Sequence, residues 1–258
     1  GPRMAMRRWL RARVLLAARW VVCNSRYTER LVRAAAPAAR TVVIPPGVDC
    51  QHFQPAADRL AARARFGLPA DRRMVLSVAR LDTYKGHDVV LRALAALPAA
   101  ARDRLQYVVA GKGEHQSALH ALAAQLGVTA NVTWLGFVAD GDLPDLYASA
   151  DLFVLCTRED PQARGVEGFG MVFLEAQASG VAVLGTQAGG IPDAIEEGRG
   201  GWLVPQDDVA AVAAHLQALA GDPAPYHAMG RSGHARVLAE CGWSHYTDRL
   251  LPLLDADT

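Results

Sequence analysis

The sequence predicts an α/β fold, a doubly wound parallel sheet of the Rossmann-like type. Between residues 73 and 204, short segments that are apolar throughout alternate with segments of amphipathic, helical character. Glycine-rich and charged stretches follow several of the apolar segments rather than preceding them. Strands that are apolar along their whole length are typical of a parallel sheet covered by helices on both faces.

Length and composition restrict the class of protein. The 258 residues suit one large or two unequal domains, and a 51% hydrophobic content suffices for a sizeable core. The net charge of +1 argues against nucleic acid as a partner. No apolar run approaches the ~20 residues of a membrane span. Four scattered cysteines without a C-x2-C pair predict free thiols in a reducing cytoplasm and no zinc site; they are Cys23, Cys50, Cys156 and Cys241.

The chain divides into three predicted parts, residues 1–40, 41–242 and 243–258. In the first, Gly1-Pro2 is interpreted as a tag remnant; a basic helix is expected over residues 3–20 and a short buried strand over 20–24. Ser25 is placed to cap the next helix. The basic helix is interpreted as an ordinary amphipathic helix with a solvated face, and a membrane-surface helix is the alternative.

A strand over residues 41–44 ends at Pro45-Pro46-Gly47, the best candidate for a domain boundary. Beyond it, strands are predicted over residues 73–79, 105–110, 131–135, 152–156, 181–184 and 202–204. Helices are predicted over residues 87–97, 116–126, 143–149, 169–179 and 191–196, and the chain is mostly helical from residue 207. In such sheets, ligands bind beyond the carboxyl ends of the strands, so the loops after strands are the candidate sites.

The most informative loop lies before and within the predicted helix at 169–179. Gly168 and Gly170 permit a tight turn and a close approach of backbone to ligand. The helix start that follows offers unpaired N–H groups to an anion. Glu167 and Glu175, eight residues apart, would lie within roughly 12 Å of each other. This arrangement suits a nucleoside diphosphate sugar, although a charged helix cap is the simpler alternative.

Three further loops carry candidate ligand contacts. After the strand at 73–79, Arg80 and Lys85 suit a diphosphate, or are solvated surface cations. His87 beside them is interpreted as structural. Gly111, after the next strand, lies where backbone contacts to a ligand would fall. Phe137 and Val138, after the third strand, could frame a nucleobase. For both loops, the alternative is that these residues only form turns.

In this order, the motifs resemble the C-terminal half of the family 4 glycosyltransferases, over about residues 41–245. The motifs are Pro46-Gly47-Val48-Asp49, Ala79-Arg80-Leu81 through Lys85-Gly86, Gly111-Lys112-Gly113, Leu135-Gly136-Phe137-Val138, Glu167-Gly168-Phe169-Gly170 to Glu175-Ala176, and Gly189-Gly190-Ile191-Pro192. The resemblance implies the GT-B architecture, with two Rossmann-like domains and an active site between them. It also implies a retaining enzyme that takes a sugar from a nucleoside diphosphate donor and needs no metal or other cofactor.

The resemblance also implies a role for each matching residue. Arg80 and Lys85 would hold the donor diphosphate, and Glu167 would meet the transferred sugar. The backbone of Gly168, Phe169, Gly170 and Met171 would contact phosphate and sugar, Glu175 the ribose, and Phe137 and Val138 the base. Pro46 replaces a frequent Asn, and Cys156-Thr157 a frequent Pro-Ser.

The largest departure is the acceptor-binding N-terminal domain, of which residues 3–36 resemble only the last helix, strand and helix. The segment after Trp243 resembles the helix that crosses back to that domain. We therefore expect donor binding without efficient transfer by this chain alone, a glycan or lipid-linked acceptor, and a cytoplasmic enzyme, peripheral on the plasma membrane. The alternative is a non-catalytic nucleotide-sugar-binding module. A GT-B epimerase or a phosphorylase with a pyridoxal cofactor is disfavoured, because no lysine stands out for that cofactor.

Overall fold

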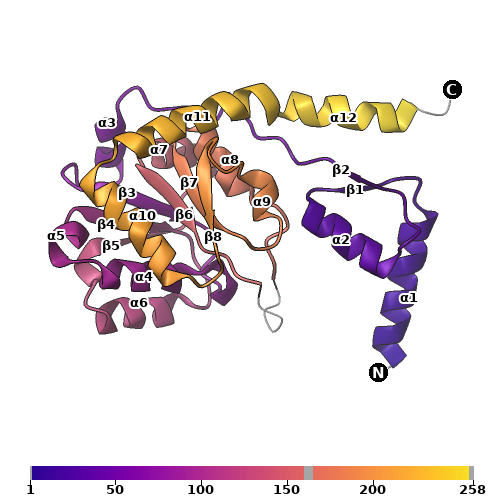
Figure 1. Cartoon of the computed structure of the whole chain (residues 1–258), viewed down its shortest axis with the longest axis horizontal. Coiled ribbons are helices and arrows are strands. Elements are labelled where there is room, and N and C mark those ends of the chain that lie inside the picture. Colours follow the sequence, from indigo (N-terminus) through magenta and orange to yellow (C-terminus); the bar gives the residue numbers. More distant parts are fainter. Residues whose placement is uncertain (1, 160–164, 256–258) are drawn as a thin grey trace.

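The computed structural model describes residues 2–159 and 165–255, which form a small unit and a larger α/β unit (Figure 1). The small unit consists of α1 (Pro2–Ala17), β1 (Val21–Cys23), α2 (Arg26–Ala35) and β2 (Thr41–Val43). Its two strands pair in parallel, Val21 beside Thr41. The side chain of Ser25 accepts a hydrogen bond from the Thr28 N–H and caps α2, as predicted.

The larger unit is built on a six-stranded, all-parallel sheet in the order β5-β4-β3-β6-β7-β8. Its strands are β3 (Arg73–Val78), β4 (Leu105–Ala110), β5 (Val132–Gly136), β6 (Leu152–Leu155), β7 (Ala182–Thr186) and β8 (Gly201–Val204). This is the doubly wound strand order of a Rossmann-like fold, so the predicted fold class is confirmed.

Helices cover both faces of this sheet. They are α3 (Arg59–Arg65), α4 (His87–Ala96), α5 (Ala99–Arg102), α6 (Gln116–Gln125), α7 (Leu143–Ala148), α8 (Met171–Ala178), α9 (Ile191–Ala194), α10 (Val209–Gly221), α11 (Ala224–Glu240) and α12 (Trp243–Asp255); short 3₁₀ turns occupy Thr83–Lys85 (η1), Thr129–Asn131 (η2) and Asp140–Asp142 (η3). Successive residues of one strand enter opposite core layers. Val75 packs with α4, α6 and α10, whereas Leu76 packs with α7, α8 and α11. Burial on both faces explains why the strands are apolar throughout.

Two predictions about local structure are corrected. The helix expected from Phe169 begins two residues later, because Gly170 adopts φ 97°, a left-handed conformation outside the helical region. The strand at 20–24 was expected to be buried, but the Val22 side chain is 38% exposed. Helix α3 was not predicted. Its Asp58 cap accepts hydrogen bonds from two N–H groups, yet the helix has little apolar periodicity.

Apolar side chains of the first helix are exposed to solvent in the described part of the chain. Trp9, Leu10, Val14 and Leu16 of α1 are each at least half exposed. The helix is basic, as expected, but neither the six-stranded sheet nor its helices cover it (Figure 1). Pro2, which was set aside as a tag remnant, is the first residue of α1, a position that tolerates proline.

The predicted boundary at Pro45-Pro46-Gly47 follows β2 directly and carries the chain into the larger unit. Gly47 packs against the start of α12, where an added Cβ would lie 2.5 Å from the Trp243 Cα. From there α12 extends away from the large sheet (Figure 1). The points where the chain enters and leaves the larger unit are therefore packed together.

Candidate functional site

The strand order puts the topological switch point between β3 and β6, and we call the space beyond the carboxyl ends of these two strands the crevice. The order reverses there, so the loops after these strands lead to opposite sides of the sheet. The two loops also touch: Gly86 has φ 71°, and an added Cβ would lie 1.8 Å from the Cys156 carbonyl oxygen. Helices α4 and α8 begin at the ends of these loops. The positive ends of two helix dipoles therefore lie at the same edge of the sheet.

Lys85 and Glu167, predicted from different loops, meet in this crevice. The Lys85 Nζ lies 2.6 Å from the Glu167 Oε2, and the two side chains are only 13% and 15% exposed. The ammonium also lies 5.1 Å from the centre of the Tyr84 ring, in a cation–π contact. Because little water reaches the pair, its charges are screened less than those of a surface pair.

Arg80 stands at the open side of the same loop, with a side chain that is 71% exposed. Its Nη2 donates to the Tyr84 hydroxyl at 3.2 Å and lies 3.1 Å from an Asp82 oxygen. Both contacts use one nitrogen, so Nε and Nη1 have no partner among the described residues. The N–H groups of Nε and Nη1 can still donate hydrogen bonds to an anion.

A buried polar chain fixes the backbone of this loop. The Tyr107 hydroxyl lies 2.9 Å from the Ser77 Oγ and 3.0 Å from the His87 Nδ1, and the His87 Nε2 lies 3.4 Å from the Arg80 carbonyl oxygen. Burial lowers the pKa of His87 to about 4, so the imidazole is neutral near pH 7. His87 is therefore structural, as expected: it holds the Arg80 backbone and does not face the crevice.

The glycine-rich start of α8 lies beside Glu167. Gly168 and Gly170 are in the loop and Met171 is the first helical residue, so their backbone groups line the helix start. Phe169 is different: its side chain is only 3% exposed and packs in the core. At the crevice, only the Phe169 backbone can meet a ligand.

A second loop supports this turn from β7. The Gly190 N–H donates to the Glu167 carbonyl oxygen at 2.9 Å, and a Cβ on Gly190 would lie 2.0 Å from the Gly168 carbonyl oxygen. The glycines at 189 and 190 are thus required by close packing against the Glu167 turn. Ser25 of the small unit approaches the same point, 2.8 Å from that Cβ position.

Glu175 lies on α8 with a partner of its own, the Tyr147 hydroxyl, which donates to its Oε2 at 2.7 Å. Burial raises the pKa of Glu175, the charge of Asp140 raises it further, and the Tyr147 hydrogen bond opposes both. Oε1 has no partner in the described part of the chain. Glu175 makes no direct contact with Lys85 or Glu167, so the predicted pair of glutamates forms two separate contact points.

The remaining predicted residues follow β4 and β5. Gly111 has φ 147°, and an added Cβ would lie 1.9 Å from the Ala79 carbonyl oxygen, so the packing of two loops is enough to explain this glycine. Phe137 is 70% exposed, an unusual position for an aromatic side chain. Val138 packs against the core beneath it. The loops after β3 and β4 are joined by the Leu81 N–H, which donates to the Lys112 carbonyl oxygen at 3.0 Å.

Sequence reasoning missed two supporting residues. Tyr84 contacts both predicted cations; its spacing, four residues after Arg80 and one before Lys85, was a usable signal. Arg158 donates to both oxygens of Asp88 at 3.0 Å and to Asp207 at 2.6 Å, and so ties the loop after β6 to α4. Its partners lie 70 and 49 residues away, so no local pattern could identify them.

Within the described residues, no group of three or more His, Cys, Asp or Glu side chains could hold a metal ion. No helix found in residues 2–159 or 165–255 is long and apolar enough to cross a membrane. What the site does offer is two cations, a sheltered carboxylate and two helix starts around one crevice. This combination favours a diphosphate joined to a hydroxyl-rich group.

Comparison with known families gives two matches. Residues 58–236 match the model described as glycosyl transferases group 1, and residues 1–52 match the model described as glycosyltransferase family 4. The first match alone spans more than half of the chain.

Individual proteins give the same picture. The chain is 36% identical, over 89% of its length, to a GDP-mannose-dependent alpha-(1-6)-phosphatidylinositol monomannoside mannosyltransferase of Mycolicibacterium smegmatis, and covers 60% of it. It is 38% identical, over 89% of its length, to a D-inositol 3-phosphate glycosyltransferase of Streptomyces avermitilis, and covers 50% of it. The structure of sucrose-phosphate synthase from Thermosynechococcus elongatus superposes with a TM-score of 0.84 at 28% identity, over 98% of this chain and 63% of that one. The chain thus spans about half to three fifths of these curated relatives.

Proposed function

Because this chain belongs to the glycosyl transferases of group 1, we propose that it is the donor-binding portion of a retaining glycosyltransferase that uses a nucleoside diphosphate sugar. The observation that carries the proposal is the sheltered ion pair of Lys85 and Glu167 at the strand switch point, 2.6 Å long, beside the open guanidinium of Arg80. Positive charge and a carboxylate at one crevice fit a ligand with an anionic end and a hydroxylated end.

In this proposal, Arg80 and Lys85 grip the diphosphate, and the amides from Gly168 to Met171 complete its surroundings. Glu167 accepts hydrogen bonds from sugar hydroxyls beside its contact with Lys85. As the glycosidic bond stretches, negative charge grows on the leaving diphosphate, and fixed cations and helix N–H groups stabilise it without a metal ion. Glu175 binds the ribose through its Oε1, and Phe137 lies by the base with Val138.

The donor base is guanine or uracil, and the acceptor is a glycan or a lipid-linked molecule. The GDP-mannose dependence of the Mycolicibacterium smegmatis relative supports GDP-mannose as the first donor to test. Transfer requires an N-terminal acceptor domain that the relatives' greater length can accommodate. We place the enzyme in the cytoplasm, peripheral on the membrane, and the exposed apolar side chains of the basic helix α1 support this placement.

A thermal-shift and calorimetry panel of GDP-, UDP- and ADP-sugars tests the donor proposal. A ligand that binds only the folded state raises the melting temperature by mass action, so one nucleotide series should stand out. The Lys85→Met variant should lose this response, and the exposed α4 variant Arg92→Met should keep it. No response to any donor would refute the proposal.

A non-catalytic nucleotide-sugar-binding module is the second candidate, because binding alone would leave the same crevice intact. Donor hydrolysis or transfer, measured with the acceptor domain supplied, separates the two. For an enzyme, the Arg80→Gln and Lys85→Met variants should lose more turnover than donor affinity, since the charge they stabilise grows in the transition state. Robust transfer by this chain alone would contradict the expectation that it is incomplete.

A further inference from the structure

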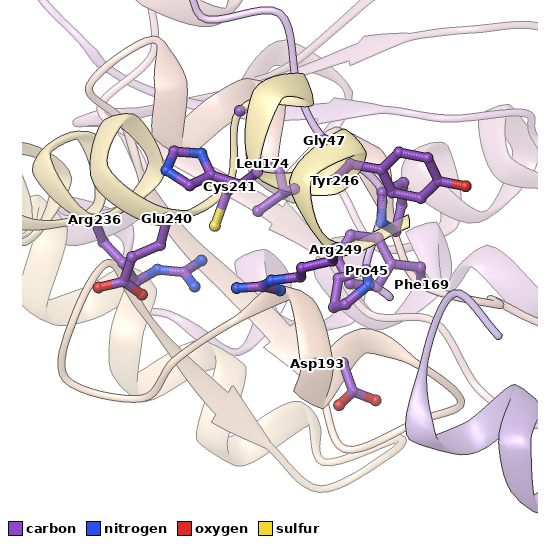
Figure 2. A pocket seen from close by; sticks show the side chains of 13 residues that line it. Pro45, Gly47, Phe169, Leu174, Asp193, Arg236, Glu240, Cys241, Tyr246 and Arg249 are labelled. Atoms are coloured by element: carbon purple, nitrogen blue, oxygen red, sulfur yellow. The ribbon is translucent and has the colours of Figure 1, made fainter. Parts of the chain in front are cut away.

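A second site lies where the chain enters and leaves the larger unit. The Val48 N–H donates to the Cys241 carbonyl oxygen at 2.9 Å, and Val48 forms a parallel bridge with Gly242. Beside this junction is a cavity of about 130 Å³, lined by the Pro45–Gly47 segment, the end of α11 and the first turns of α12 (Figure 2). We call it the junction cavity. None of the residues proposed to grip the donor's phosphates, sugar or ribose through their side chains lines it.

Arg236 of α11 is buried in the wall of this cavity, with 7% of its surface exposed. Its Nη2 donates to the Gln177 Oε1 at 3.0 Å and to the Ala194 carbonyl oxygen at 2.9 Å. Its Nε is buried and has no hydrogen-bond partner. A charged donor that is enclosed without an acceptor is unfavourable, and it leaves the Arg236 guanidinium with more donors than the described chain satisfies.

Arg249 reaches the same cavity from α12. Figure 2 shows the guanidinium groups of Arg236 and Arg249 pointing toward one another. No residue of the described chain accepts a hydrogen bond from Arg249. Two cations that face each other repel unless an anion lies between them. The His245 Nδ1, also in the lining, is buried without a partner.

The two carboxylates in the lining already have partners, and the pKa of Glu240 is lowered by its hydrogen bond with Arg199 and further by the nearby charges of Arg236 and Arg249. Asp193 accepts from the Arg26 backbone N–H at 2.9 Å, and Glu240 pairs with Arg199 at 2.9 Å. They offset part of the positive charge, but neither accepts a hydrogen bond from Arg236 or Arg249. The cavity therefore offers two facing guanidinium groups with N–H groups that have no acceptor in the described chain.

We propose that the junction cavity binds a free phosphate-type oxyanion, held by the guanidinium groups of Arg236 and Arg249. Guanidinium groups bind the oxygens of such anions through two N–H groups at once. A volume of about 130 Å³ accepts a tetrahedral oxyanion and is small for a nucleotide or sugar nucleotide, whose pockets are ~300 Å³ or more.

The bound anion would link α11, α12 and the segment at Pro45 across the junction of the two units. Phe169 and Leu174 line the same cavity, and they flank the start of α8, whose backbone is proposed to contact the donor. Occupancy would thus stiffen the support of the donor site from behind. This regulation goes beyond donor binding and involves a ligand of its own.

The test titrates inorganic phosphate into the full chain by calorimetry and by thermal shift, with chloride matching the ionic strength. We expect saturable 1:1 binding that chloride and acetate do not reproduce. The Arg249→Gln variant changes an exposed side chain, so it should fold, and it should weaken phosphate binding at least about tenfold. The matched control Arg231→Gln, also exposed and on α11 but outside the cavity, should bind normally.

The donor crevice is the competing phosphate site, and Arg80→Gln separates the two. Binding that survives Arg80→Gln and is weakened in Arg249→Gln supports the junction cavity, whether or not donor binding is found. Binding lost in Arg80→Gln and kept in Arg249→Gln places the phosphate in the crevice and overturns the proposal. No phosphate-specific response in the wild type means that water alone fills the cavity, and an equal response to acetate removes the assignment to phosphate; either result also overturns it.

Discussion

Two charged clusters lie at opposite ends of the same neighbouring strands, β3 and β6, and they differ in how completely the protein uses them. At the amino ends, Asp151 is 4% exposed and surrounded by partners. Its Oδ1 lies 3.0 Å from the Arg59 Nη1 and 2.9 Å from the His227 Nε2. Its Oδ2 accepts from the Arg63 Nη2 at 2.6 Å and from the Met74 N–H at 2.7 Å.

At the carboxyl ends, the cluster of Lys85, Glu167 and Arg80 is only partly satisfied. Lys85 and Glu167 pair with each other, but two nitrogens of Arg80 are left open. A carboxylate whose four contacts all come from the chain itself contributes to stability. Charged side chains with unused hydrogen-bond donors beside a crevice are placed to bind a ligand. The same chemistry thus serves stability at one end and recognition at the other.

The largest effect should follow from Asp151→Asn. The change keeps the shape but leaves Arg63, which is 4% exposed in its side chain, buried without a counter-charge. Breaking one partner of a buried ion pair costs about 3–5 kcal/mol of the free energy of unfolding. Urea denaturation should show this loss. The control is Asp142→Asn, which breaks an exposed pair with Arg65 and should cost about 1 kcal/mol or less. Equal losses in the two variants would contradict a special role for the amino-end cluster.

The same cluster should make stability depend on acid. Burial alone would raise the pKa of Asp151, but the hydrogen bond with His227 and the charges of Arg63 and Arg59 outweigh it and lower the pKa to about 2. The unfolded chain, with an ordinary Asp pKa of 3.8, binds the proton first as the pH falls. The stabilisation is therefore complete above about pH 4 and is lost toward pH 2. The stability gap between wild type and Asp151→Asn should narrow over that range, and a constant gap would argue against the low pKa.

At the carboxyl ends, Lys85→Met should affect donor binding strongly and the free energy of unfolding only weakly. Donor affinity should fall roughly 10- to 100-fold, because a hydrogen bond between charged groups is worth about 1.5–3 kcal/mol. The loss in unfolding free energy should be smaller than that of Asp151→Asn, because the side chains of Lys85 and Glu167 are 13% and 15% exposed, against 4% for both Arg63 and Asp151. Calorimetry with the donor and urea denaturation give the two numbers. If Lys85→Met is strongly destabilised but binds the donor normally, the carboxyl-end cluster serves stability and not ligand binding, and the distinction drawn between the two ends is wrong.

The fold could be predicted from sequence because it depends on local periodicity. Each strand of the large sheet was found within about two residues, since burial on both faces makes it continuously apolar. The strand order was not predictable in this way, and neither was the start of α8, which depends on the left-handed conformation of Gly170. Helix α3 escaped notice because it is held by arginines that reach Asp151, not by an apolar face.

The site was only half predictable for a related reason. Arg80, Lys85 and Glu167 could be found because each follows a strand, and parallel strands gather such loops at one edge. The direct contact of Lys85 with Glu167 joins residues 82 apart and needed the structure. The saturated cluster was missed entirely: Asp151 and Arg63 are 88 residues apart, and Asp151 precedes a strand, where no ligand was expected.

Glu175 has one oxygen paired within the protein and one left open, and changing its partner gives the smallest predicted effect on stability and donor binding. One oxygen is held by the Tyr147 hydroxyl at 2.7 Å, and the other is left for the proposed ribose. Tyr147→Phe should cost about 1 kcal/mol of unfolding free energy, as for a typical hydrogen bond. It should also lower donor affinity roughly threefold, since a ligand-binding side chain that is no longer held in place binds less well.

The matched control is Tyr226→Phe, at the β8 edge of the sheet, where the hydroxyl donates to the His215 carbonyl oxygen at 2.7 Å. Tyr226 is nearly as buried as Tyr147, at 4% against 0%, so both variants should lose similar stability in urea. Only Tyr147→Phe should change donor binding by calorimetry. If neither variant does, Glu175 is held by the protein for stability alone, and it belongs with Asp151 rather than with Lys85. If both variants lower donor affinity, the lower affinity reflects a general destabilisation of the domain. In that case, the distinction between fully paired and open charges does not apply to Glu175.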